Sequence, residues 1–243
     1  MEVVRSARLA LSFDLAAVQT EVAGMAESGW RPHFQTAHYD GGWAVLPLRT
    51  IDGREDEFLP FSLDGQPATY GPTPLLQTCP ALQNVLDLFR CPVMSVRLLR
   101  LEPHAVIKTH RDVGLAFEEG EARVHIPLFT SPAVEFVVDD HPLRMDAGSC
   151  WYVNANLAHR VTNRGSNDRI HLVVDCVVDD WLRDLFAEAE CSKSVVRRDP
   201  AQLRLMIELL SSMNTPVALR LVASLRHELR EAQRTCPEFA GTA

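Results

Sequence analysis

Two residues whose side chains commonly bind metals stand two apart in the segment THRDVGL, His110 and Asp112. Side chains two apart on a β-strand point to the same face, so both would project together if the strand continues through them. An imidazole and a carboxylate make two ligands for a divalent metal. A mononuclear iron site of the two-histidine, one-carboxylate type needs one further histidine. The histidines available for that place are His104, His125, His141, His159 and His171.

His159 is the preferred third ligand. It stands in NLAHRVTN, at an expected strand start 49 residues after His110. We expect that separation if the two strands face each other across a small jelly roll. The alternative is that His110, Asp112 and His159 are ordinary polar residues at the ends of strands.

Arg169 is the residue best suited to bind an anion near such a metal. It begins the apolar segment RIHLVVD, where a charge is costly unless it meets an opposite charge. The planar fork of a guanidinium matches a carboxylate bidentately. A salt bridge to Asp168 or Asp175 is the alternative use.

Three further polar residues could line the same cavity. Arg123 and His125 in ARVHIPL share a strand face by the same period of two. A backbone carbonyl could instead satisfy His125. Arg97, in VMSVRLL, either points inward with Leu99 or lies on the surface as an exposed charge.

The elements that would position these residues are mostly short strands. Between residues 92 and 178, β-branched and aromatic segments alternate with turn residues, which predicts an antiparallel jelly roll. Before it, Asp14 is an expected N-cap and Pro80 an expected helix start. After Asp180 the period becomes helical, with helices expected from Asp199-Pro200 and Thr215-Pro216. We therefore expect a β domain over residues 1–180 with N-terminal helices, followed by a helical extension over 181–243.

Composition excludes several classes of protein. The formal net charge is −8, which argues against a nucleic-acid surface. No C-x-x-C pair occurs among the six cysteines, so zinc-ribbon and thioredoxin readings fail and reduced thiols are expected. The first residues do not resemble a signal peptide, and no stretch is long enough for a membrane span. These observations favour a cytoplasmic protein.

Five segments together carry a family resemblance. They are L-x-P-H-A-x-I-x-x-H-R-D at 101–112, R-V-H-I-P-L at 123–128, M-D-A-G-S-C-W-Y at 145–152, H-R-V-T-N at 159–163 and R-I-H-L-V-V-D at 169–175. In this pattern the region from Arg97 to Asp180 resembles the aspartyl/asparaginyl β-hydroxylase family, which includes bacterial proline hydroxylases. The first 80 and last 50 residues match no motif of that family.

The resemblance implies a double-stranded β-helix that uses Fe(II), 2-oxoglutarate and O₂ to hydroxylate a C–H bond. It implies His110, Asp112 and His159 as iron ligands and Arg169 on the distal carboxylate of 2-oxoglutarate. Arg123 and His125 would lie near the other end of the co-substrate. Arg97 is grouped with them as a binding residue, and a further cation near the metal would favour a substrate that carries a carboxylate.

The expected function is therefore hydroxylation of an amino acid or amino-acid-like small molecule. One alternative is a cupin-type metalloenzyme without 2-oxoglutarate, which would keep the metal ligands and not need Arg169. Another is a non-catalytic domain that binds a small ligand. The C-terminal helices could form a homodimer, since Leu221, Leu225 and Leu229 lie at helical spacing.

Overall fold

The computed structural model describes residues 2–56, 68–112, 114–196 and 200–213, with positions 219, 222–223, 225–227 and 229–230. The chain divides into two compact units. One is Val4–Lys193, and the other joins Met1–Val3 to Ser194–Ala243. The first unit includes Leu182 and Phe186, which pack into its core.

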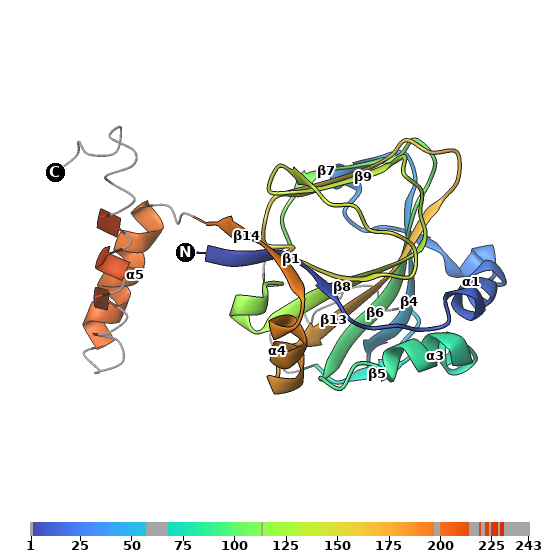
Figure 1. Ribbon diagram of the computed structural model, residues 1–243, viewed down its shortest axis with the longest axis horizontal. Helices are drawn as coiled ribbons and strands as arrows, with labels where there is room; N and C mark the ends of the chain where they lie inside the picture. The colour runs from blue at the N-terminus through green and yellow to red at the C-terminus, as the bar shows by residue number, and fades with distance from the viewer. Residues whose placement is uncertain are drawn as a thin grey trace. The chain divides into compact units, whose positions relative to one another are not determined.

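Two antiparallel sheets form the first unit (Figure 1). The larger contains β1 (Glu2–Leu9), β2 (Arg31–Pro32), β4 (Trp43–Ile51), β5 (Tyr70–Pro72), β6 (Val93–Leu101), β8 (Glu121–Phe129), β11 (Cys150–Val153), β13 (Arg169–Val177) and β14 (Glu190–Val195). The smaller contains β3 (Tyr39–Asp40), β7 (Val106–His110), β9 (Val134–Val138), β10 (His141–Pro142) and β12 (His159–Asn163). The strand orders are β14-β1-β11-β8-β13-β6-β4-β2, with β5 beside β4, and β10-β9-β12-β7-β3. This mainly β, jelly-roll-like arrangement confirms the predicted fold class.

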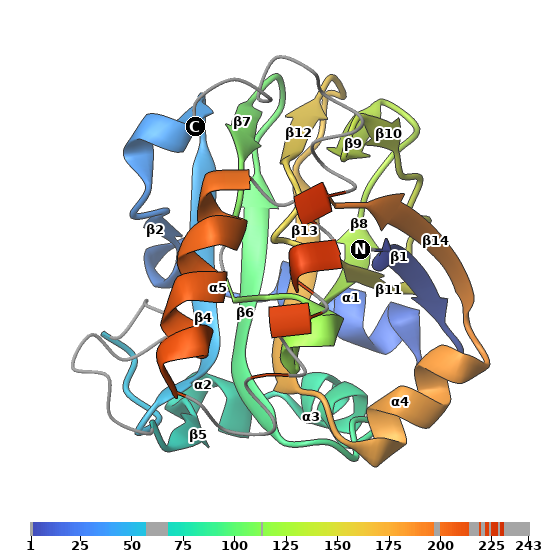
Figure 2. The same cartoon turned by 90° about the vertical axis from the view of Figure 1, so that its left-hand side faces the viewer.

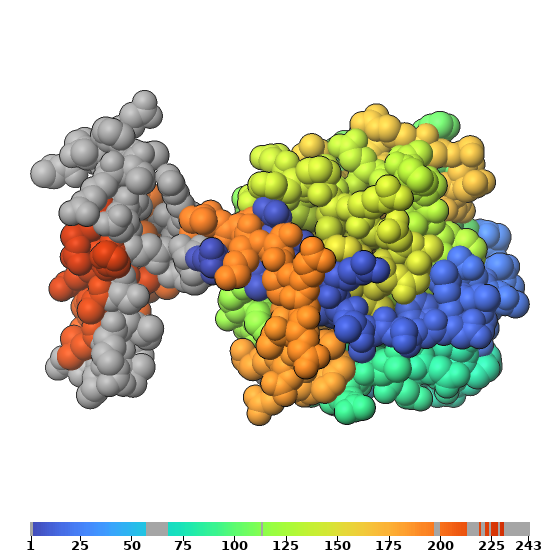
Figure 3. Space-filling model, viewed as in Figure 1, coloured from blue at the N-terminus to red at the C-terminus, as the bar shows by residue number. Residues whose placement is uncertain are grey.

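Helices cover the outer face of the larger sheet. These helices are α1 (Leu15–Ala23), α2 (Pro74–Gln77), α3 (Pro80–Leu86) and α4 (Asp180–Ala187). A further helix, α5 (Pro200–Met213), belongs to the second unit. Asp14 caps α1 as predicted, since its side chain accepts from the N–H of Ala17. Glu21 of α1 accepts the N–H groups of Ala81 and Leu82 at the start of α3, at 2.7 and 3.0 Å. This contact joins the two helices on one face of the unit (Figure 3).

The strand pleat gives the larger sheet two chemically different faces. In β6, β8 and β13, which lie side by side in Figure 2, the even-numbered side chains pack toward the helices. Those residues are Val96, Leu98, Ala122, Val124, Ile126, Leu128, Leu172, Val174 and Cys176. Odd-numbered side chains therefore face the space between the sheets. That inner face carries Arg97, Arg123, His125, Arg169, His171 and Asp175, so one set of strands provides both the core and the polar interior.

Parts of the chain beyond the family motifs also join the sheets. The first strand runs over Glu2–Leu9 and joins the larger sheet beside β11, and β4 pairs with β6 near the other edge of that sheet. Glu190–Val195 is a strand, which the helical period after Asp180 does not predict. The helix expected from Thr215-Pro216 begins outside the described residues. None of the helices in the described part of the chain has the length and hydropathy needed to cross a bilayer.

Candidate active site

His110, Asp112 and His159 come together at one end of the smaller sheet. Their possible ligand atoms all lie within 4.8 Å of one another. His110 ends β7 and His159 begins β12, and the two are directly opposed across that antiparallel pair. Their ring centroids lie 4.2 Å apart. The histidines are thus neighbours within one sheet, and the expectation that their strands face each other across the barrel is wrong.

Both histidine rings have their Nδ1 atoms beside a backbone carbonyl. The Nδ1 atom of His110 lies 2.8 Å from the oxygen of Lys108, and that of His159 lies 3.0 Å from the oxygen of Leu157. A carbonyl can only accept, so Nδ1 carries the proton in each ring and Nε2 keeps its lone pair. Burial lowers the pKa of His159 to about 4, which keeps that ring neutral. Rings held at Nδ1 in this way can turn Nε2 toward a divalent metal.

Asp112 lies beyond the end of its strand. Since β7 stops at His110, the pleat does not place the carboxylate, contrary to the expectation of a shared strand face. Backbone contacts place it instead: the N–H of Asp112 donates to the carbonyl of Ala155 at 2.9 Å. Asn156 accepts from the N–H of Leu115 at 3.1 Å. The loop that carries the carboxylate is therefore tied to the loop that precedes His159, and Asp112 Oδ1 lies 3.9 Å from His110 Nε2.

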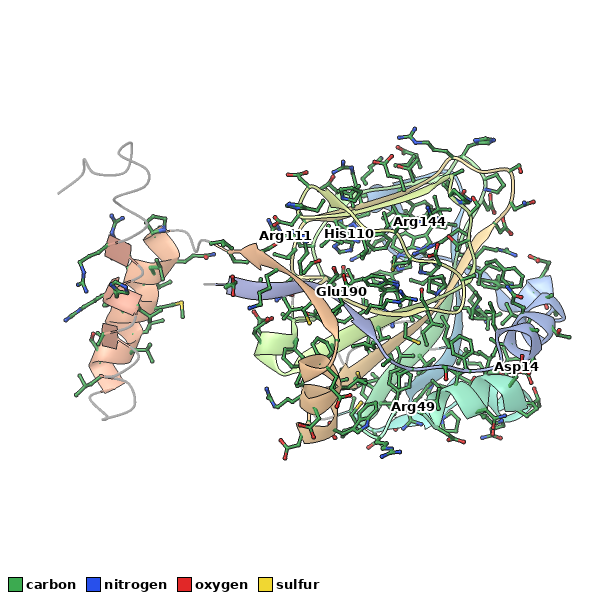
Figure 4. The ribbon with its side chains drawn as sticks, in the orientation of Figure 1. Asp14, Arg49, His110, Arg111, Arg144 and Glu190 are labelled. Carbon is green, nitrogen blue, oxygen red and sulfur yellow. The ribbon has the colours of Figure 1, made fainter. Side chains whose placement is uncertain are left out.

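A cavity of about 540 Å³ opens beside these three residues, between the two sheets. Its lining includes the residues expected to bind the metal or the co-substrate: Arg97, His110, Asp112, Arg123, His125, His159 and Arg169. Figure 4 draws the side chains between the sheets, with His110 labelled among them. The fold thus brings the predicted set together, while the role of each residue remains a prediction.

A buried ion network forms one wall of the cavity. Asp175 accepts from Arg123 Nε and Nη2 at 2.7 and 3.0 Å, and from Arg97 Nη1 at 2.9 Å. The other terminal nitrogen of Arg123, Nη1, contacts the carboxylate of Asp112. Burial alone would raise the pKa of Asp175, but the two guanidinium charges hold it well below its usual range. Arg97 therefore points inward, which resolves the two orientations that its sequence context left open.

Arg169 has no acidic partner among the described residues. Asp168, one of the two proposed partners, lies 3.9 Å from Arg100, and Asp175 is taken by Arg97 and Arg123. Arg169 is 1% exposed, and its Nε has no hydrogen-bond partner in the described structure. Burial lowers its pKa to about 9, so it remains charged at neutral pH. A buried, uncompensated guanidinium at a cavity wall is fitted to receive an anion.

His33 lines the cavity and was not identified from the sequence. His33 stacks on Trp43, with centroids 3.5 Å apart and planes at 9°, and both line the cavity. Burial lowers the pKa of His33 to about 3, so this flat wall is uncharged. Tyr39 packs edge-on against Trp43 and does not line the cavity. No sequence pattern around His33 indicates a role, because its stacking on Trp43 and its place in the cavity depend on how the strands pack.

Comparison with known proteins identifies the family. Residues 13–178, more than half of the chain, match the family model described as aspartyl/asparaginyl beta-hydroxylase. The chain belongs to this family. A curated relative, L-proline cis-3-hydroxylase 1 from a Streptomyces species, is 29% identical over 155 residues, 62% of this chain and 53% of the relative. The chain therefore spans about half the length of that curated relative.

Two of the solved structures that resemble parts of the chain are the following. One is a 2OG-Fe(II) oxygenase family oxidoreductase from Burkholderia pseudomallei, 17% identical, covering 67% of this chain and 77% of that chain, with a TM-score of 0.44. The other is a Pseudomonas putida prolyl-4-hydroxylase, 13% identical, covering 72% and 92%, with a TM-score of 0.42. Membership of the β-hydroxylase family rests on the match over residues 13–178. The description of that family model agrees with the resemblance found in the sequence.

The ion network predicts a large stability loss when Asp175 loses its charge. Asp175→Asn would leave two buried guanidinium groups without their shared counter-charge, so we expect the free energy of unfolding to fall by about 3–5 kcal/mol. Urea denaturation measures it. Glu135→Gln, which removes a largely exposed ion pair with Arg164, is the control and should cost less than about 1 kcal/mol. A loss of similar size in both variants would contradict the role given to Asp175.

Buried histidines predict that acid weakens the fold. Burial, with the charge of Arg169 close by, lowers the pKa values of His125 and His171 well below 6.5. Below pH 6.5 both histidines become protonated in the unfolded protein but stay neutral in the folded protein. The free energy of unfolding therefore falls as the pH falls. Each should contribute about 1.4 kcal/mol of loss between pH 7.5 and 5.5. Urea denaturation of the metal-free protein at both pH values should show at least the two contributions together, and a pH-independent stability would refute them.

Proposed function

We propose that this chain is an Fe(II)- and 2-oxoglutarate-dependent dioxygenase that hydroxylates a C–H bond of an amino acid or an amino-acid-like molecule. The observation that carries the proposal is the pairing of two features in one cavity. One is the His110, Asp112 and His159 cluster, and the other is Arg169, buried and charged without an acid of its own. A metalloenzyme without a dicarboxylate co-substrate has no use for the second feature.

The chain's residues divide the work between the two sheets. The Nε2 atoms of His110 and His159, with one oxygen of Asp112, would hold Fe(II) from the smaller sheet and the loop beside it. When bound, the metal supplies the chemistry that couples oxidation of 2-oxoglutarate to succinate and CO₂ with transfer of one oxygen atom to the substrate. Arg169, on the larger sheet, would receive the distal carboxylate of 2-oxoglutarate as a bidentate pair.

Arg123 and His125 complete the co-substrate wall. Arg123 is held by Asp175 and contacts the Asp112 carboxylate, so it fixes the oxygen of Asp112 that does not face His110. His125 is 7% exposed and its Nδ1 has no partner among the described residues, which leaves that atom available to a ligand. A backbone carbonyl, the alternative partner considered for His125, is not found at this atom.

The remaining cavity supports a small zwitterionic substrate. Its lining includes the cation Arg97 and the carboxyl group of Glu121, which could meet the two charges of a free amino acid. The stacked His33 and Trp43 provide a flat apolar wall, and the indole N–H of Trp43 is buried without a partner among the described residues. The curated relative is named for hydroxylation of L-proline. We propose a substrate of that size and charge. A screen of free amino acids by mass spectrometry, for a product that has gained one oxygen atom, would identify it.

The arrangement of the second unit remains a prediction. We propose that residues beyond the barrel serve as a helical extension and that a homodimer forms through it. Leu205 and Leu209 of α5 are 57% and 58% exposed, which supports an apolar surface there. Sedimentation of the full chain checks the proposal.

The metal assignment predicts a strict dependence on His159. We expect His159→Ala to abolish turnover and to weaken Mn(II) or Fe(II) binding by at least about 100-fold, since loss of even an outer-shell partner costs 10–100-fold. Anaerobic calorimetry measures the affinity, and thermal unfolding should still show a folded protein. His141→Ala, at an exposed histidine outside the cluster, is the control and should bind metal normally. Normal metal affinity in His159→Ala would overturn the assignment.

The co-substrate assignment predicts a selective effect of Arg169→Lys. Lysine keeps the charge and loses the fork, so 2-oxoglutarate affinity should fall by about 10–100-fold, the equivalent of one charge-assisted hydrogen bond. Metal affinity should be unchanged. The measurement is anaerobic titration of the Fe(II) protein, followed by the metal-to-ligand charge-transfer band.

Arg100→Lys is the matched control, because Arg100 lies on the neighbouring strand β6 and does not line the cavity. It should keep the 2-oxoglutarate affinity of the wild type. Equal affinities in wild type and Arg169→Lys would refute the role of Arg169. Absence of 2-oxoglutarate binding in the wild type would favour a cupin-type enzyme without this co-substrate.

A further inference from the structure

His171 contacts Arg169 on the strand that both residues share, β13. Arg169 Nη2 lies 2.8 Å from His171 Nδ1, and each residue is 1% exposed. A guanidinium only donates, so Nδ1 of His171 is the acceptor and the proton of the neutral ring sits on Nε2. Burial and the neighbouring charge of Arg169 lower the pKa of His171 well below its usual value, in agreement with a neutral ring. The contact is therefore directional.

The same pair lies between two cavities. Arg169 lines the cavity of the metal cluster, while His171 lines a second one of about 260 Å³. Phe136 lines both and lies under the guanidinium, with Arg169 Cζ 5.9 Å from the ring centroid. The Nε2 of His171 is buried and has no partner within the described structure. The imidazole thus contacts Arg169 through Nδ1, and the same residue lines the second cavity.

Arg169 keeps one direction only if something holds it. The acids that line the second cavity, Glu135 and Asp146, pair with Arg164 and Arg144. An arginine side chain that nothing holds can rotate about several bonds. A neutral acceptor placed behind the guanidinium limits this rotation without cancelling the charge. An acid in the same place would hold Arg169 equally well but would neutralise it.

We propose that His171 is a positioning residue that directs the guanidinium of Arg169 into the metal-cluster cavity and so sets the preference for a 2-oxo acid with a distal carboxylate. The inference rests on the proposed function, since it assumes that Arg169 receives that carboxylate. Strand geometry supports it, because residues 169 and 171 share the inner face of β13. On the neighbouring strands His171 is opposed by Leu99 and Pro127, neither of which offers a polar side chain to Arg169.

The experiment compares two probes that differ in the distal carboxylate. 2-Oxoglutarate has it and 2-oxobutanoate lacks it, and both are titrated anaerobically into the Fe(II) protein. For His171→Phe, which keeps a ring and removes the acceptor, we expect 2-oxoglutarate to bind about tenfold more weakly. The affinities for 2-oxobutanoate and for the metal should stay within twofold of wild type. His171→Gln, whose side-chain oxygen can accept, should restore 2-oxoglutarate affinity to within about threefold.

Controls separate positioning from packing. Val173→Ala removes buried volume from the same strand face, so it should lower thermal stability and leave the ratio of the two affinities unchanged. In the double variant His171→Phe with Arg169→Lys, the loss should be no larger than for Arg169→Lys alone, because one residue acts through the other. If His171→Phe does not fold, the His171→Gln and His171→Leu variants decide the question by the same ratio.

Each outcome has a definite reading. Equal weakening of both probes by His171→Phe, or no weakening of 2-oxoglutarate, overturns the positioning role while wild-type binding still supports the proposed function. Failure of the wild type to bind 2-oxoglutarate overturns both. Selective loss with rescue by glutamine supports the assignment.

Discussion

The carboxylate of Asp175 holds together three strands at the centre of the larger sheet. It sits on β13 and accepts from Arg97 on β6 and from Arg123 on β8, so each neighbour of the central strand is tied to it by a buried charge pair. Burying one carboxylate with two guanidinium groups is stable only if every strand keeps its register. The same register places His125 and Arg169 on the inner face. Asp175 therefore links the stability of the fold to the shape of the cavity.

Much of the candidate site followed from local patterns in the sequence. The period of two put Arg123 and His125 on one strand face, and the cost of a charge in an apolar segment singled out Arg169. The strand starts at His159 and Arg169 are as expected. The apolar residues at even-numbered positions indicated which face of each strand packs against the helices. A shift of one residue would place the charged side chains in that helix-covered core.

The errors came from contacts that no local pattern encodes. Asp112 lies off the strand and is placed by a hydrogen bond to Ala155, 43 residues away in the chain. The pairing of β7 with β12, which makes His110 and His159 neighbours, depends on strand order and not on either segment. The partners of Asp175 depend on the register of three strands, and His33 reaches the cavity from a region without family motifs.

The division of the site between two sheets has a mechanical consequence. All three proposed metal ligands belong to the smaller sheet and its adjoining loop, whereas Arg169 belongs to the larger one. The distance between the two sheets would then select the length of the co-substrate, because its two ends would be bound by residues of opposite sheets. A 2-oxo diacid one methylene longer or shorter could bind in the same way only if one whole sheet shifted against the other. Selection by molecular length would thus be a property of how far apart the sheets pack, which side chains remote from the cavity help to set.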